Sequence, residues 1–190
     1  MISAAERLAL LRLARASVWA QVHGQPPAEP SVVAGELSRR AGAFVTLHKQ
    51  GHLRGCIGYV EPDRPLAQVV AQCAVAACSA DPRFPAVAPA ELSDIEIELS
   101  VLGPLEPIVG LDQMEVGRHG LAVELGLRRG LLLPQVAVER GWDCRTFVEQ
   151  TCQKAGLSPD AWAHGSTTLW KFEAEVFGEA GLPTVPTKMP

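Results

Sequence analysis

The segment from Asp94 to Leu102 has the most regular alternation of apolar and polar residues in the chain. The apolar positions are Ile95, Ile97, Leu99 and Val101, and the polar ones are Glu96, Glu98 and Ser100. Successive side chains of a strand point to opposite faces of its sheet. The pattern therefore predicts a strand of an antiparallel sheet that is covered on one face only.

A β-hairpin is predicted upstream of this strand. Residues 42–47 and 53–59 are both suited to strands, and Lys49-Gln50-Gly51-His52 lies between them. Because Gly51 is free to adopt a positive φ, the connection is expected to be a loop of about three to five residues.

Two features of residues 53–59 bear on function. Alternation predicts that Arg54 and Cys56 share one face, and that Leu53 and Ile57 point to the other face, toward the core. The glycines at positions 55 and 58 weaken an ordinary strand. They predict a bulge, or a place where another group approaches the backbone closely.

Helices are predicted on both sides of the hairpin. Ser3 and Glu6 have the spacing of a capping box and begin a helix that runs to about Val22. A second helix follows Pro65 and ends before Asp81-Pro82. A third follows Asp143, which is a suitable N-cap, and Gly156 is suited to the position after its last turn.

The remaining strands complete an α+β chain. A second hairpin is predicted from residues 121–125 and 130–133, and one last strand from residues 168–176. Strands and helices follow one another without a regular βαβ rhythm, which indicates the α+β class. The expected architecture is an antiparallel sheet flanked by helices.

Composition excludes several classes of protein. The net charge of −4 lacks the basic excess of a nucleic-acid-binding domain. The five cysteines are an odd number without Cys-x-x-Cys pairs, which indicates reduced thiols rather than disulfides or structural zinc. Without a signal-peptide pattern or an apolar run long enough to cross a bilayer, the expected location is cytoplasmic, away from membranes.

Five motifs together resemble one known family. Leu53-Arg54-Gly55-Cys56-Ile57-Gly58 is similar to the signature of the AMMECR domain family, component A of the AmmeMemoRadiSam system. The other four motifs, in the family's order, are Asp81-Pro82-Arg83-Phe84-Pro85, Ile97-Glu98-Leu99-Ser100-Val101-Leu102, His119-Gly120-Leu121 and Gly130-Leu131-Leu132-Leu133-Pro134-Gln135-Val136-Ala137. The resemblance runs from about Gly42 to Phe177.

The resemblance implies an architecture and a class of partners. It implies a larger lobe that holds both termini, a smaller β-rich lobe, and a cleft near the motifs. Residues 1–178 are accordingly expected to form a single two-lobed domain, and residues 179–190 a flexible tail. Memo-type and radical-SAM proteins are the partners that it implies, and it specifies no reaction and no cofactor.

Cys56 and His119 are the candidate catalytic residues. A thiolate is the reactive form of cysteine, and a cation such as Arg54 would favour it. The alternative is that Cys56 is a small apolar residue of a glycine-rich strand. His119 lies in a glycine-bracketed turn, where it would act as a general base or a ligand, or would simply be exposed or make one backbone hydrogen bond.

The candidate binding residues are charged, amide or glycine residues of the same motifs. Arg54 and Arg83 could form a fork for a carboxylate or phosphate, although Asp81 is an alternative partner for Arg83. Gln135 would either line the same cleft or cap a loop. The bare backbone at Gly55 and Gly58 would admit a small anionic group, and no metal site is predicted.

Two functions remain open from the sequence. The first is a thiol-dependent enzyme or a protein that binds an anionic ligand, with Cys56, His119, Arg54 and Arg83 in the cleft. The second is a non-catalytic protein-binding or scaffold module that uses the same surface. The remaining cysteines, Cys73, Cys78, Cys144 and Cys152, are expected to be core thiols.

Overall fold

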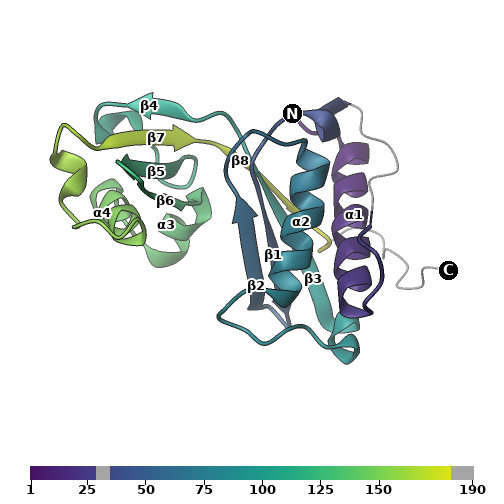
Figure 1. Cartoon of the computed structure of the whole chain (residues 1–190). Coiled ribbons are helices and arrows are strands. Elements are labelled where there is room, and N and C mark those ends of the chain that lie inside the picture. Colours follow the sequence, from purple (N-terminus) through teal and green to yellow (C-terminus); the bar gives the residue numbers. More distant parts are fainter. Residues whose placement is uncertain (29–34, 181–190) are drawn as a thin grey trace. The chain divides into compact units, whose positions relative to one another are not determined.

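The computed structural model describes residues 1–28 and 35–180, and the chain consists of two compact units. The first unit comprises Met1–Leu102 and Glu175–Pro190, and the second comprises Gly103–Ala174. Each unit contains one antiparallel four-stranded sheet with helices (Figure 1). The predicted α+β class is confirmed.

The first unit packs two long helices on one face of its sheet, as Figure 1 shows. The strand order is β2-β1-β3-β8. The elements are α1 (Ala4–Val22), η1 (Gly35–Ser38), β1 (Ala43–Lys49), β2 (His52–Tyr59), α2 (Leu66–Ser79), η2 (Pro89–Asp94), β3 (Ile95–Leu102) and β8 (Ala174–Gly178).

The sheet of the first unit buries the face that the alternation of β3 predicts. Ile95, Ile97, Leu99 and Val101 are all buried and belong to the core that α1 and α2 complete. Val45 and Leu47 of β1 pair with Leu99 and Ile97 and lie in the same core. The other face of this sheet carries the polar residues of β3.

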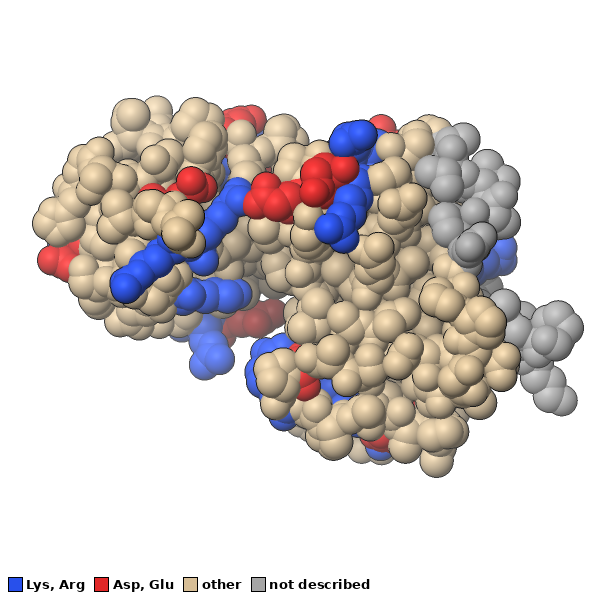
Figure 2. Space-filling view, in the orientation of Figure 1, with Lys and Arg blue, Asp and Glu red and all other residues tan. Residues whose placement is uncertain are grey.

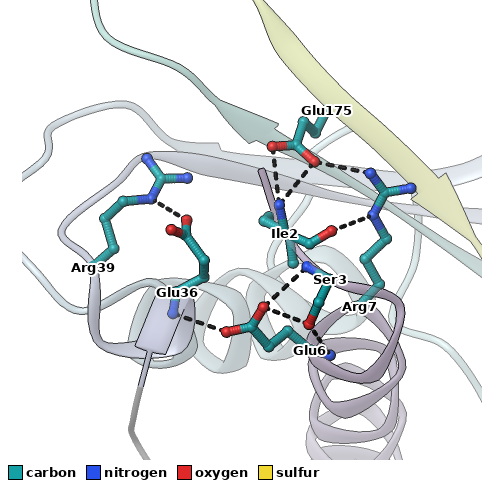
Figure 3. A network of polar contacts seen from close by, with 7 residues as sticks. All are labelled: Ile2, Ser3, Glu6, Arg7, Glu36, Arg39 and Glu175. Carbon is teal, nitrogen blue, oxygen red and sulfur yellow. Dashed lines mark hydrogen bonds and ion pairs between the residues drawn. The ribbon is translucent and has the colours of Figure 1, made fainter.

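Hydrogen bonds hold the start of α1 in place (Figure 3). Ser3 and Glu6 form the predicted capping box, and the Glu6 carboxylate also accepts the backbone N–H of Glu36 at 3.0 Å. Glu175 of β8 accepts the N–H of Ile2 and a hydrogen bond from Arg7 at 2.9 Å. The first turn of α1 is thus tied to η1 and to β8.

A second polar connection lies at the end of β8. Arg15 of α1 forms an ion pair with Glu179 and donates to the carbonyls of Leu92 and Ile95. Glu179 also accepts the N–H of Ile97 at 2.9 Å. Glu179 is the first residue of the expected tail, and residues 181–190 lie outside the part that the structure describes.

The second unit packs α3 and α4 on its own sheet, which has the strand order β4-β7-β5-β6. Asp143 caps α4 through the N–H of Thr146, and Gly156 follows the helix with a positive φ, as predicted. The elements are β4 (Glu106–Ile108), η3 (Leu111–Gln113), β5 (Gly120–Leu125), β6 (Arg128–Leu132), α3 (Pro134–Arg140), α4 (Cys144–Lys154), η4 (Ala161–Ala163) and β7 (Thr168–Phe172).

Two predictions about strand boundaries were wrong. The first hairpin has a two-residue turn, Gln50-Gly51, rather than a loop of about three to five residues, because β1 extends to Lys49 and β2 begins at His52. The predicted last strand is two strands that separate at Glu173, with β7 in one sheet and β8 in the other. Alternation continues across that break and does not reveal it.

The surface of the described residues carries both positive and negative charges. Figure 2 shows acidic and basic side chains next to one another on the visible face. Among residues 1–28 and 35–180, no helix is both long and apolar enough to span a bilayer.

Candidate functional site

The predicted bulge lies in the motif strand β2. Leu47 of β1 pairs with Gly55, whereas the next residue, His48, pairs with Leu53, so Arg54 is the extra residue. Such a bulge bends the strand and changes the direction of the side chains around it. The motif is therefore an irregular strand, as its glycines predict.

The bulge overturns one expectation about side-chain directions. Leu53 pairs with His48 and Cys56 pairs with Thr46, and these two residues of β1 lie on the same face. Leu53 therefore shares the face of Cys56, is 41% exposed, and does not point into the core as predicted. Ile57 does pack against the core, on the side of the helices.

Close contacts explain both glycines of the motif. A Cβ atom at Gly55 would overlap with the carbonyl oxygen of Ala77, because α2 crosses β2 at this point. A Cβ atom at Gly58 would overlap with the ring of Phe44. Gly55 therefore leaves room for the backbone of α2, and Gly58 leaves room for the ring of Phe44.

Asp81 and Arg83 bind the backbone of Cys56. The Asp81 carboxylate accepts the Cys56 N–H at 2.8 Å, and Arg83 donates to the Cys56 carbonyl at 3.2 Å. The two side chains also pair with each other through hydrogen bonds of 2.9 and 2.7 Å. The structure thus brings three of the predicted site residues together, and the predicted alternative, pairing of Arg83 with Asp81, is observed.

Arg54 is bound by a carboxylate that the sequence analysis did not identify. Glu91 accepts two hydrogen bonds of 3.0 Å from Arg54 and one from Lys49. Arg54 also donates to the carbonyl of Pro85 at 2.9 Å. It is only 13% exposed and fixes the chain between α2 and β3 against β2.

The two carboxylates are strongly stabilised in their charged form. Hydrogen bonds from Arg54, from the N–H of Ala88 and from Lys49 lower the pKa of Glu91 to about 2. The guanidinium of Arg83 is the largest cause that holds the pKa of Asp81 far below its usual value. Asp81 in turn is the main cause that raises the pKa of Arg83, to which the Cys56 thiol also contributes.

The Cys56 thiol lies on the face of the sheet opposite the helices. It is half-buried, and the hydroxyl of Thr46 lies 3.4 Å from its sulfur. By contrast, Cys73, Cys78 and Cys152 are buried as predicted, and burial raises the pKa of Cys73 to about 12. Cys144 is only half-buried, so its assignment to the core is only partly correct.

His119 and Gln135 lie in the second unit. The Nδ1 atom of His119 accepts the N–H of Glu115 at 2.9 Å, and the His119 N–H donates to the Glu115 carbonyl. This is the predicted backbone-bonding alternative for His119, although the residue is buried. Gln135 is the second residue of α3, a helix that the sequence analysis missed. The assignment of Cys56 and His119 as catalytic residues stays a prediction.

The charged side chains of this site in the first unit are paired with one another rather than open to a ligand. Arg54, Asp81, Arg83 and Glu91 each have a partner of opposite charge. Among the residues that the structure describes, no group of three or more His, Cys, Asp or Glu side chains is placed to hold a metal ion. The cluster fixes the loop after α2 and leaves the Cys56 side chain partly accessible.

Comparison with known proteins identifies relatives across nearly the whole chain. The family model described as AMMECR1 matches residues 11–177. A protein from Methanothermobacter thermautotrophicus is 43% identical over 187 residues, which cover 95% of this chain and 97% of the relative. One from Thermofilum pendens is 43% identical over 195 residues, 94% of this chain and 92% of the relative.

A solved structure has the same fold. The crystal structure of the uncharacterized protein PH0010 from Pyrococcus horikoshii matches with a TM-score of 0.83 and 42% identity, and the match covers 89% of both chains. The five sequence motifs, the family model and this structural match agree. The chain belongs to the AMMECR1 family.

Proposed function

We propose that the first unit is a non-catalytic binding module, and that the surface around Cys56 recognises a partner protein. The observation that carries this proposal is the internal pairing of both motif arginines. Arg54 is bound to Glu91 and Arg83 to Asp81. Both guanidinium groups therefore stabilise the fold and are already paired with a carboxylate of the same chain. A fork for a free anion would need guanidinium groups that lack such partners.

The surroundings of the thiol support the same proposal. A nucleophilic cysteine is activated by a neighbouring base or by a cation that lowers its pKa. The Thr46 hydroxyl lies 3.4 Å from the Cys56 sulfur, and Arg83, which also interacts with the thiol, is neutralised by Asp81. The Nδ1 atom of His119 already accepts a backbone hydrogen bond.

The partner class comes from the family resemblance. Memo-type and radical-SAM proteins are the candidates, and the exposed Leu53 beside Cys56 is a suitable contact for either. Titration calorimetry of the full chain with each purified protein tests this. We expect saturable binding to one of them, weakened about tenfold by Leu53→Glu.

A matched control separates this surface from the rest of the molecule. Val138 in α3 is also apolar and 60% exposed, and we expect Val138→Glu to leave the affinity unchanged. Cys56→Ser should also retain binding, because the proposal gives the sulfur no covalent role. Absence of binding to both proteins, or equal effects of the two glutamate variants, would contradict the proposal.

A thiol-dependent enzyme that acts on a small anionic substrate is the second candidate. One observation favours it: Arg83 donates to the Cys56 carbonyl at 3.2 Å, so its guanidinium lies next to the residue that carries the thiol. In that function Arg83 rather than Arg54 would be the cation beside the sulfur, with His119 as the base. Loss of function in a well-folded Cys56→Ser variant would favour this candidate.

A further inference from the structure

Strand β2 forms one edge of the first sheet, and at Gly58 its outward backbone groups have no hydrogen-bond partner among residues 1–28 and 35–180. The N–H of Cys56 points away from β1, because it donates to Asp81. In an antiparallel pair, the residues whose backbone N–H and C=O groups point away from the partner strand recur at every second position. Phe44 pairs with Gly58 two positions further along, so the N–H and C=O of Gly58 also point outward.

Neither of these Gly58 groups is used within the described part of the chain. Among residues 1–28 and 35–180, the hydrogen bonds outside the strand pairing include none to the N–H or C=O of Gly58. Such an edge is a template for pairing with another strand. The N–H of Gly58 needs an acceptor and its C=O needs a donor. The backbone of an extended polypeptide beside β2 would supply both.

The neighbouring position shows how this edge is satisfied. At Cys56, the Asp81 carboxylate accepts the N–H and the Arg83 guanidinium donates to the C=O. This ion pair therefore supplies the acceptor and the donor that an adjacent strand would supply. It covers the edge at Cys56 and stops short of Gly58.

Phe44 indicates which side chain an added strand would present. Its ring lies where a side chain at Gly58 would be, on the face opposite the helices, and it is half-buried. Directly opposed side chains of paired strands contact each other on the same face. An added residue opposite Gly58 would therefore place its side chain against this ring, which favours an aromatic or large apolar residue.

We propose that the outer edge of β2 at Gly58 binds an extended segment of a partner protein by strand addition, with an aromatic or large apolar residue against Phe44. This inference rests on the proposed binding function and names the form of the partner. A second copy of the chain fits less well, because it would bring its own Asp81–Arg83 pair to the same edge and shorten the possible ladder.

Amide hydrogen exchange tests the proposal with a blocked synthetic peptide of alternating threonine and valine around a central phenylalanine. In the free full chain, we expect the Gly58 amide to exchange rapidly and the Ile57 amide, which faces β1, to be protected. At a peptide concentration of ten times Kd, the Gly58 amide should be protected by about tenfold. Strong protection of Gly58 before peptide is added would overturn the proposal.

Two variants isolate the backbone donor. Gly58→Ala and Gly58→Pro both add a Cβ atom that displaces the Phe44 ring, but only the proline removes the outward N–H. We expect the proline variant to lose peptide binding and the alanine variant to retain it with lower affinity. Equal affinities would show that the N–H is not used.

Further outcomes distinguish this proposal from the one on which it rests. Binding of a Memo-type or radical-SAM protein, without peptide protection of Gly58 and with equal affinities for Gly58→Ala and Gly58→Pro, would leave the binding function intact and overturn strand addition. Protection of Gly58 that depends on protein concentration alone, together with a dimer in solution, would assign the edge to a second copy of the chain and overturn the partner segment.

Discussion

The carboxylate of Asp81 accepts the backbone N–H of Cys56 at a distance of 2.8 Å. This bond joins the loop after α2 to the outer edge of β2, and the Asp81 side chain is only 2% exposed. Arg83 follows Asp81 two residues later, after Pro82. It donates a hydrogen bond to the carbonyl of the same Cys56.

Removing the Asp81 carboxylate is expected to destabilise the first unit. Asp81→Ala leaves the Cys56 N–H without its acceptor and Arg83 without its counter-ion, and should lower the free energy of unfolding by about 1–3 kcal/mol. Arg83→Ala should destabilise the unit as well, because the buried Asp81 carboxylate then loses its counter-ion. The Arg118–Glu173 pair is exposed on both sides, so Arg118→Ala is the control and should cost less than about 1 kcal/mol. Urea denaturation of the variants checks this, and an equal or larger loss for Arg118→Ala than for Asp81→Ala would contradict the account.

Glu91 is expected to make stability depend on pH in the acid range. Its pKa is lowered from 4.5 to about 2 in the folded chain, so its contribution is present above about pH 4.5 and is lost as the pH falls toward 2. The difference in unfolding free energy between the wild type and Glu91→Gln should therefore shrink over that interval. Urea denaturation at a series of pH values measures it, and a constant difference would refute the prediction.

Gly55 is expected to tolerate no side chain. Because a Cβ atom would meet the backbone of α2 at Ala77, Gly55→Ala should lower the free energy of unfolding by about 1–3 kcal/mol. Gly165 has no atom within 4 Å of such a Cβ, so Gly165→Ala is the matched control and should change stability by less than about 0.5 kcal/mol. Similar stabilities of the two variants would contradict the close packing of α2 on β2.

Local patterns in the sequence were sufficient to predict much of the fold. The capping box at Ser3, the N-cap at Asp143 and the alternation of β3 each depend on neighbouring residues, and each is confirmed. The helix α3 was missed because it is short and follows an apolar strand without a polar cap.

The candidate site was harder to predict, because its contacts join residues far apart in the chain. The sequence suggested the pairing of Asp81 with Arg83, which are two residues apart, but not that of Arg54 with Glu91, which are 37 residues apart. The bulge at Arg54 was suggested by Gly55, but its effect on Leu53 depends on which residue of β2 is unpaired. Alternation alone does not contain that information.

The rate of alkylation of Cys56 in the native protein, measured by mass spectrometry as a function of pH, tests the central claim most directly. The internal pairing of Arg54 and Arg83 predicts that Cys56 reacts no faster than free cysteine from about pH 6 to about pH 9. The buried Cys73 serves as the internal reference for an unreactive thiol. Faster reaction at neutral pH, with a thiolate pKa well below that of free cysteine, would contradict the account and assign Cys56 to catalysis.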